Sequence, residues 1–357
     1  MSKRYFDCVV VGAGPAGLSV AYYLKRMGVN FVLIDEHGIG ASWENMNDTL
    51  RLVSPWWTNV LPGTIPNPLH AFEKHSRLSF VRYLQSYYKK NDLGPVLQER
   101  VCEVHSCSDG YSIETAEGGL IQAKSVVCAS GYFGNPYFPE IESDDSVEIV
   151  HASSYKNVKQ LLARGVAKVL VVGRRVTAGQ LAEELYSAGI SVTLSARGQV
   201  EVKRNDSFMG GLREQVYFFW ESLKLYFQPE VKANSYAIMD GGKIREYIHS
   251  GSIPVLGKPQ KIEAGMVYLE GRDAPLAVDQ IWLATGYKPN LGYLKSFNLS
   301  FEDSSMPVIV QQLHDAYPGV HLVGFDNLFN FTSRYLRGIR RDSKRIAKQI
   351  EAHLKPG

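Results

Sequence analysis

Apolar runs along the chain predict a unit in which a buried strand passes through a glycine-rich turn into a helix. Residues 8–11 are apolar on both faces, as expected for a central strand of a parallel sheet, and the turn 12–17 follows at once. Helical residues continue to Met27, and a second apolar strand, 31–34, comes next. This spacing predicts a βαβ unit at the start of the sequence.

The same pattern returns in the second half of the chain. Residues 168–172 are predicted to form a buried strand, 179–187 a helix and 191–194 a further strand. An amphipathic pattern over 79–90 predicts another helix, whose apolar face serves packing. Because strands alternate with helices, these segments predict an α/β fold.

The first turn has the spacing G-x-G-x-x-G. Gly12 permits the tight turn, Gly14 lets a pyrophosphate approach the backbone, and Gly17 lets the helix pack close to the strand. The N-terminal end of that helix favours negative charge, and a carboxylate after the second strand suits ribose hydroxyls. The motif therefore predicts dinucleotide binding by Gly12, Gly14, Pro15, Ala16, Gly17 and Asp35.

Composition excludes several other classes of protein. Hydrophobic residues make up 45% of the 357 residues and charged residues 21%, which is too apolar for disorder. A balance of 39 basic and 36 acidic residues, without a basic run, predicts no nucleic-acid partner. Glycines interrupt the apolar segment 8–24, and no stretch approaches the about 20 apolar residues of a membrane span. We therefore predict no signal sequence and no membrane partner.

Cysteine usage favours a reducing compartment. The four cysteines include no C-x-x-C pair and no zinc-like spacing with histidine, so we predict a cytoplasmic protein without a bound metal. Cys102 and Cys107 allow a pairing across a hairpin, but two separate thiols are the favoured interpretation.

Two later segments repeat one design, in which a buried strand leads into small residues. Ala129-Ser130-Gly131 follows the strand 125–128, and Ala284-Thr285-Gly286 follows the strand 281–283. Near the end of the chain, Gly324-Phe325-Asp326 terminates a further apolar strand. Together with the first turn, these segments resemble the class B flavoprotein monooxygenases, a flavin-containing monooxygenase-like group of two-dinucleotide-binding-domain flavoproteins. The resemblance also includes Ser42-Trp43 and Gly242-Lys243-Ile244-Arg245.

This resemblance implies two Rossmann-like dinucleotide-binding domains of glutathione-reductase type, the second inserted into the first. The FAD-binding domain is expected at 1–150 and again at 281–357, and an NAD(P)H-binding-like domain at 151–280. The two small-residue segments correspond to the hinges of the family, although the first has serine in place of threonine. In addition to the first turn, the resemblance assigns to FAD Ser42, Trp43, Arg51, Val101, Ser130, Gly131, Thr285, Gly286 and, at the ribityl chain, Asp326.

The second turn departs from the family pattern G-x-G-x-S-[AG], because Arg175 replaces the central glycine. A side chain there obstructs a pyrophosphate, whereas a guanidinium offers hydrogen bonds to phosphate. Three interpretations stay open: NAD(P)H in an altered pose, a different ligand, or a different electron donor. The following strand lacks a terminal carboxylate, which favours NADPH over NADH, and Arg197 is then a candidate to hold the 2′-phosphate. In the alternative interpretation Arg197 is a solvated loop charge. The predicted contacts are Gly173, Arg174, Arg175, Thr177 and Arg197.

The aromatic loop 50–63 is the predicted substrate side. In the family an asparagine after threonine contacts the flavin or nicotinamide, so Asn59 is the catalytic candidate. Trp56 and Trp57 are predicted to line the substrate pocket. The alternative is that this aromatic loop only fills the space between the two domains. Of the family fingerprint F-x-G-x-x-x-H only His151 remains.

The resemblance implies an FAD-dependent, NADPH-dependent monooxygenase that forms a flavin C4a-hydroperoxide and oxygenates a small molecule. A flavin reductase or oxidase acting on a disulfide, quinone or amine is the alternative, and a non-catalytic flavin-binding protein is the third. The segment 209–228 suits a tunnel, a dimer surface or, as favoured, a domain core, and homo-oligomerisation stays open. Arg334 and Arg337 are predicted to lie on a solvated helix face rather than at an anion.

Overall fold

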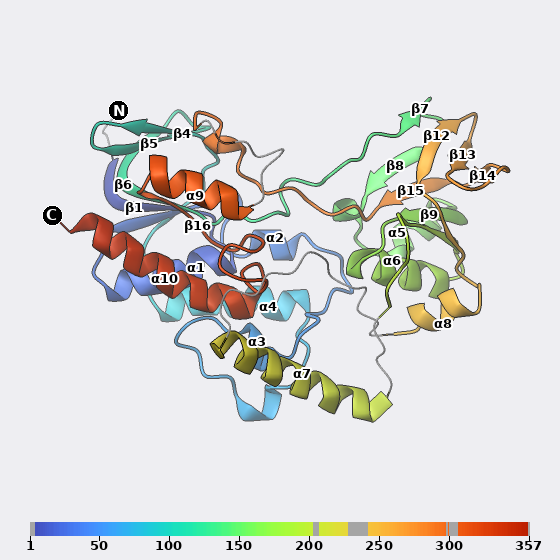
Figure 1. The fold of residues 1–357 in the computed structure, drawn as a ribbon, viewed down its shortest axis with the longest axis horizontal. Helices are drawn as coiled ribbons and strands as arrows, with labels where there is room; N and C mark the ends of the chain where they lie inside the picture. Colours follow the sequence, from blue (N-terminus) through green and yellow to red (C-terminus); the bar gives the residue numbers. More distant parts are fainter. Residues whose placement is uncertain (1–3, 203–206, 228–241, 298, 300–305, 356–357) are drawn as a thin grey trace.

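The computed structural model describes residues 4–202, 207–227, 242–297, 299 and 306–355, and their strands form three sheets (Figure 1). The seven-stranded sheet is a parallel sheet with an antiparallel hairpin, β4 and β5, at one edge. β16 pairs with the last residues of β6, which brings the two ends of the sequence into one sheet. In spatial order the strands are β3 (Val96–Leu97), β2 (Phe31–Ile34), β1 (Arg4–Val11), β6 (Leu120–Cys128), β5 (Gly110–Thr115) and β4 (Val101–Cys107), with β16 (Val320–Leu322) beside β6.

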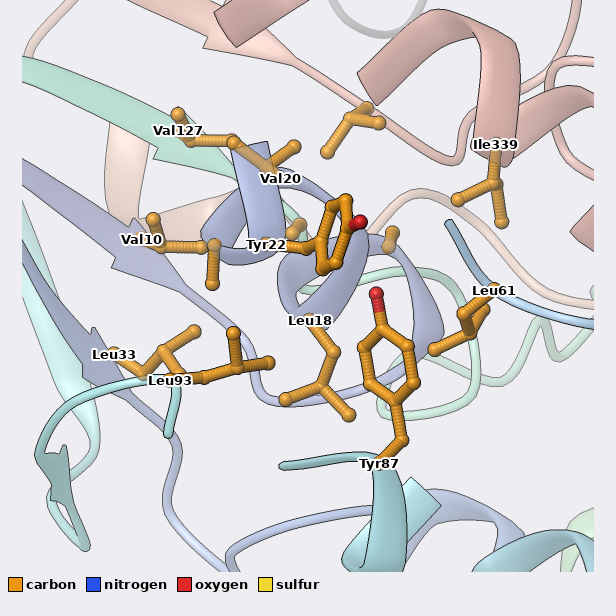
Figure 2. Close-up of a cluster of buried hydrophobic side chains, with 14 of the residues drawn as sticks. Val10, Leu18, Val20, Tyr22, Leu33, Leu61, Tyr87, Leu93, Val127 and Ile339 are labelled. Atoms are coloured by element: carbon orange, nitrogen blue, oxygen red, sulfur yellow. The ribbon is translucent and has the colours of Figure 1, made fainter. Parts of the chain in front are cut away.

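Helices cover both faces of this sheet because β1 is apolar on both sides. Cys8 and Val10 pack with α1 (Pro15–Arg26), α4 (Arg77–Lys90) and α10 (Leu336–Leu354), as Figure 2 shows for part of this cluster. Val9 and Val11 pack on the other face with α9 (Met306–Ala316). The predicted helix 79–90 is thereby confirmed, and it begins two residues earlier than expected.

The second sheet is entirely parallel and repeats the plan of the first. One face packs on helices α5 (Val158–Ala163), α6 (Val176–Ser187) and α8 (Ile244–His249), and the other on a small third sheet. The second sheet contains β11 (Val255–Leu256), β10 (Ser191–Ser195), β9 (Lys168–Val172), β15 (Gln280–Leu283) and β8 (Glu148–His151), and the third contains β14 (Leu276–Ala277), β13 (Met266–Leu269), β12 (Pro259–Glu263) and β7 (Glu142–Ser143). The expected α/β fold is confirmed.

Two short helices and α7 lie outside these layers or connect them. The aromatic loop contains α3 (Trp56–Asn59), and α2 (Ala41–Glu44) precedes it. α7 (Ser207–Phe227) extends from the second unit to the first, where it lies beside α3 (Figure 1). Single turns of 3₁₀-helix occur at Pro68–His70, Ala152–Ser154 and Gly292–Leu294.

α7 corrects the interpretation of its segment as a domain core. Phe218 is buried, but Tyr217, Phe219 and Trp220 are 45%, 60% and 60% exposed. The helix lies across the surface of the first unit, so only one of its faces is covered. Tyr226 and Phe227 belong to α7, but their side chains lie outside the described set.

The cysteines are all free, and Cys102 and Cys107 lie on the same strand, β4. The interpretation as two separate thiols is therefore confirmed. Within the described residues, none of the helices is both long and apolar enough to cross a bilayer.

A buried carboxyl group in α10 carries a cost at neutral pH. Asp342 is 2% exposed, and its Oδ2 has no hydrogen-bond partner. Burial raises its pKa from 3.8 to about 6, against the lowering effects of a hydrogen bond from Ser333 and of the charges of Arg341 and Arg345. The folded state therefore binds this proton more tightly than the unfolded chain does, and stability decreases as pH rises through 6.

We expect Asp342→Asn to stabilise the protein at pH 7.5 by about 1–3 kcal/mol, since one pKa unit corresponds to about 1.4 kcal/mol. The gain should shrink below pH 6 and disappear near pH 4, where the carboxyl group is neutral in the folded state. Urea unfolding over this pH range measures the difference. Asp273→Asn, at an exposed bend, is the control. A loss of stability on Asp342→Asn at pH 7.5 would contradict the assignment.

Candidate functional site

The turn after β1 is held against the first hinge by backbone hydrogen bonds. Gly12 N–H donates to Ile34 O at 2.7 Å, and Ala129 N–H donates to Val11 O at 2.8 Å. A methyl group at Gly12 would lie 2.5 Å from Ala129 O, so the hinge itself requires glycine here. The strand, the turn and the hinge thus form one tightly packed corner.

The other two glycines of this turn differ in what surrounds them. A methyl group at Gly17 would lie 1.9 Å from Gly12 O, so helix packing requires this glycine. Gly14 has φ −79° and ψ −172°, which any residue adopts, and a methyl group there would meet no atom within 4 Å. Packing within the chain therefore does not explain Gly14, whereas a pyrophosphate against the backbone does. The turn fits the predicted dinucleotide.

Asp35 lies at the end of β2, facing this turn. Its Oδ2 accepts the Ala13 N–H at 2.7 Å, and its Oδ1 accepts the N–H groups of His37 and Gly38 at 3.0 and 2.9 Å. These bonds orient the carboxylate toward the turn. A carboxylate offers about four lone-pair sites, so capacity is left for a further donor such as a ribose hydroxyl.

The turn after β9 has the same backbone geometry. Gly173 N–H donates to Ser195 O at 2.9 Å, and Ala284 N–H donates to Val172 O at 2.8 Å. A methyl group at Gly173 would lie 2.6 Å from Ala284 O, so the second hinge approaches its turn as the first hinge does. The register agrees as well, because Val172 pairs with Leu283 as Val11 pairs with Cys128.

The two turns differ at the residue before the helix. Arg175 has φ −113° and ψ −171° at the start of α6, which is close to the conformation of Gly14 at the start of α1. Its side chain therefore leaves the backbone at the position that Gly14 keeps open. Arg174 Nη1 donates to Arg197 O at 3.4 Å, so these three arginines gather at one sheet edge. Arg174, Arg175, Thr177 and Arg197 are all exposed.

The two hinges are joined to each other. Asn290 N–H donates to Gly131 O at 2.8 Å, Lys288 N–H to Asn135 O at 2.9 Å, and Tyr137 N–H to Gly286 O at 3.0 Å. Side chains reinforce this ladder, since Ser130 Oγ donates to Asn290 O at 2.5 Å and Thr285 Oγ1 to Tyr137 O at 2.6 Å.

His151 fastens the second hinge. Its Nδ1 accepts the Ser153 N–H at 3.0 Å, so Nε2 carries the proton and donates to Gly286 O at 3.0 Å. Burial lowers the pKa of His151 and so favours the neutral ring, and it outweighs the raising effect of the bond to Gly286. This histidine holds the polypeptide where it passes between the two units.

Asp326 lies near the N-terminal end of α1, opposite the first turn. A methyl group at Gly324 would lie 3.0 Å from Ala16 Cβ, which places the end of β16 against that helix. The carboxylate of Asp326 accepts hydrogen bonds from Arg334 Nη1 at 3.0 and 3.1 Å. The backbone N–H of Asp326 donates to Tyr132 Oη at 2.7 Å. The prediction of Arg334 as a solvated charge is therefore corrected, because this arginine balances Asp326.

Asn59 is 3% exposed, and its amide bonds within its own turn. Nδ2 donates to Ser54 O and Pro55 O at 2.9 and 3.2 Å, and Oδ1 accepts from Ser54 Oγ at 2.8 Å. These bonds shape the turn that presents the two tryptophans. The catalytic role of Asn59 stays a prediction.

The two tryptophans occupy different surroundings. Trp56 is 7% exposed and stacks on His75 at 4.1 Å, with the edge of its ring system packed on Tyr83. Trp57 is half-buried, and its Nε1 donates to Gln215 Oε1 of α7 at 2.8 Å. Trp56 thus belongs to the core of the first unit, whereas Trp57 joins that unit to α7.

The remaining predicted FAD residues lie at the periphery of the first turn or away from it. Trp43 is half-buried, and its ring lies 4.6 Å from Phe80, while Ser42 beside it is exposed. Arg51 is exposed, and its Nη1 donates to Lys74 O at 3.3 Å. Val101 begins β4.

Sequence reasoning missed the residues that join distant segments. Tyr132 directly follows the first hinge, and that adjacency was an available signal. Glu221 binds Arg337 through two hydrogen bonds, so Arg337 is paired and not a solvated charge as predicted. No sequence signal links these two residues, which lie 116 positions apart. Among the described residues, no group of side chains suited to a metal ion occurs.

Comparisons with known proteins agree with this architecture. A family model described as pyridine nucleotide-disulphide oxidoreductase matches residues 9–324. The "Uncharacterized oxidoreductase CzcO" of Bacillus subtilis is 27% identical, over 97% of this chain and 99% of that protein. The "Probable indole-3-pyruvate monooxygenase YUCCA3" of Arabidopsis thaliana is 27% identical, over 96% and 86%. The flavin-containing monooxygenase structure from Stenotrophomonas maltophilia superposes with a TM-score of 0.79 at 21% identity, over 99% and 100%.

The different surroundings of Gly14 and Gly17 generate a paired prediction. Gly14→Ala should leave the thermal stability of the cofactor-free protein unchanged but weaken FAD binding at least about tenfold, because the methyl group obstructs the pyrophosphate. Gly17→Ala should destabilise the cofactor-free protein by about 1–3 kcal/mol through overpacking. Thermal unfolding and titration with FAD measure the two effects. A loss of apoprotein stability in Gly14→Ala would show that this glycine serves the fold.

Proposed function

Because the chain belongs to the pyridine nucleotide-disulphide oxidoreductase family, we propose that it is an FAD-dependent monooxygenase that takes electrons from NADPH. It transfers one oxygen atom from O₂ to a small molecule and reduces the other to water. The predicted resemblance to the flavin-containing monooxygenase-like group is confirmed by the comparisons, and so is the classification as an oxidoreductase. The open space beside Gly14 is the single observation that carries the cofactor assignment.

When bound, FAD accepts a hydride and passes the electrons to oxygen, while the protein supplies binding, orientation and exclusion of water. The N-terminal end of α1 and the bare backbone at Gly14 suit the pyrophosphate. Asp35 offers further acceptor capacity to ribose hydroxyls, and Asp326 suits the ribityl hydroxyls. Arg334 Nη1 donates to both oxygens of Asp326, and a carboxylate offers about four lone-pair sites, so acceptor capacity is left for the ribityl hydroxyls.

We assign the second turn to NADPH. Positive charge gathers at the turn after β9, from Arg174, Arg175 and Arg197. The equivalent turn after β1 is the one that suits a pyrophosphate. In this proposal Arg175 replaces the close backbone approach with charge-assisted hydrogen bonds. The absence of a carboxylate after β10 favours a 2′-phosphate.

A domain division into 1–150, 151–280 and 281–357 accompanies this assignment. Sheet membership supports the order of these parts, because β16 returns to the first sheet after the second sheet is complete, but it moves the boundaries to the hinges, since β7, β8 and β15 pair in the sheets of the second unit. The hinges mark the two crossings. The substrate side then lies at α3, where Trp57 contacts α7, and Asn59 is the proposed catalytic residue.

The alternative is a reductase or oxidase without oxygen insertion. Dithiol chemistry by the protein itself is disfavoured, since Cys8 and Cys128 are fully buried, and Cys102 and Cys107 lie five residues apart on one strand and do not pair. Burial raises the pKa of Cys128 to about 12 and that of Cys8 further, so neither forms a reactive thiolate at neutral pH. Direct reduction of a small disulfide or quinone by the flavin is the remaining form of this alternative.

Anaerobic mixing with NADPH tests the proposal. Purified protein should be yellow, and NADPH should bleach it faster than NADH does. On admission of air, a monooxygenase should release hydrogen peroxide slowly, whereas a reductase or oxidase should release it as fast as the flavin regains its colour. A colourless protein that does not take up FAD would overturn every flavin-based interpretation.

Arg175→Gly separates the two roles of the unusual arginine. If Arg175 binds phosphate, as we propose, the variant should raise the Kd for NADPH about tenfold, the value of one charge-assisted hydrogen bond. Tighter binding in the variant would instead identify the side chain as an obstacle. The exposed Arg272→Gly serves as the control for the loss of surface charge. Rates of anaerobic flavin reduction at increasing NADPH concentration give the Kd of the parent protein and of each variant.

A further inference from the structure

The outward face of α7 is apolar, whereas its inward face is polar except for the buried Phe218. Leu212, Val216, Phe219 and Trp220 recur at helical spacing and are 61%, 46%, 60% and 60% exposed. A surface helix of a globular protein normally shows the opposite arrangement. Contiguous exposed apolar surface of this kind marks a site of association.

The inward face of α7 holds the helix on the first unit through polar contacts. Glu214 binds Lys74 at 3.0 Å, Gln215 accepts from Trp57, and Glu221 forms a buried pair with Arg337. These contacts fix the orientation of the helix. The apolar face of α7 therefore points outward because polar contacts hold the opposite face on the first unit.

A neighbouring segment carries further exposed apolar side chains. Ile65, Leu69 and Phe72 are 92%, 86% and 64% exposed. The segment lies next to α7, because Ala71 O accepts the Trp57 N–H and Lys74 binds Glu214 (Figure 1). We call this surface the apolar rim; it comprises Ile65, Leu69, Phe72, Leu212, Val216, Phe219 and Trp220.

Charges around the apolar rim are mainly positive. Arg213 and Lys224 are exposed on α7, and the two acidic residues of this helix, Glu214 and Glu221, are turned inward and paired. In the segment 61–76 the only acidic residue is Glu73, which binds His70 at 2.7 Å. The rim therefore presents cations without a compensating row of acids.

A further cation lies behind the first residues of this segment. Arg340 of α10 is within electrostatic range of Tyr83, whose hydroxyl donates to Thr64 Oγ1 at 3.0 Å. In the part of the chain that the structure describes, Arg340 makes no ion pair or hydrogen bond.

We propose that the apolar rim rests on the surface of a bilayer that contains anionic lipids. Large apolar and aromatic side chains with flanking Lys and Arg are the composition of helices that lie in the membrane interface. The anionic headgroups complement Arg213 and Lys224. A second copy of the chain fits less well, because a two-fold contact at the rim would bring equal charges together. This proposal departs from the predicted absence of a membrane partner, which rested on the lack of a spanning segment, because here the protein lies on the bilayer without crossing it.

Co-sedimentation with vesicles tests this proposal on the FAD-loaded protein. Vesicles of phosphatidylcholine mixed with phosphatidylglycerol should bind the protein, and phosphatidylcholine alone should bind it at least about tenfold more weakly. Phe219→Ser combined with Trp220→Ser should reduce binding to the mixed vesicles by about tenfold or more. Tyr268→Ser, at a 37% exposed position on β13, is the control and should bind normally.

Two further variants separate the contributions. Arg213→Glu with Lys224→Glu should remove the preference for phosphatidylglycerol. Ile65→Ser, which lies outside α7, should weaken binding even if the helix variant does not fold. Thermal unfolding reports whether each variant is folded.

Two results would overturn the proposal. One is the absence of binding to mixed vesicles at low salt. The other is a dimer, seen by light scattering, that Phe219→Ser with Trp220→Ser dissociates and that does not bind vesicles, which would identify a second copy as the occupant. Vesicle binding requires no electron transfer, so its failure leaves the proposed oxygenase activity untouched.

Discussion

The close approach of a hinge carbonyl to a turn glycine is the constraint on which the rest of the structure depends. Ala129 O lies where a side chain at Gly12 would be, and Ala284 O lies where a side chain at Gly173 would be. Both contacts follow from strand register, because each hinge leaves a strand that is parallel to the strand before the turn. Any residue larger than glycine would move the hinge, and with it the relative position of the two units.

Much of this architecture was predictable because its signals are local. Apolar runs, glycine spacing and the small residues of the hinges lie within short windows of sequence. They predicted β2, β9 and β10 nearly to the residue, and the C-terminal half of β1. The start of α6 was predicted three residues late, since Val176 follows two arginines and the helix begins without a side-chain cap.

The features that could not be predicted depend on contacts between distant segments. His151 meets Gly286 across 135 positions, and the fingerprint pattern gave no indication of this role. The resemblance assigned Asn59 a contact with the flavin or nicotinamide, but its hydrogen bonds to Ser54 and Pro55 depend on how that turn closes. The outward apolar face of α7 was also unexpected, because an aromatic-rich sequence does not say which side a neighbouring unit covers.

The ladder between the hinges has a mechanical consequence. Two separate flexible linkers would let the units slide, twist and separate independently. Here three backbone hydrogen bonds unite both crossings into one short ribbon, which bends more easily than it shears. We therefore expect relative motion of the units to be a swing about this ribbon. The distance between the two glycine turns would then vary mainly along one coordinate, and the contacts of α7 with the first unit would limit the swing.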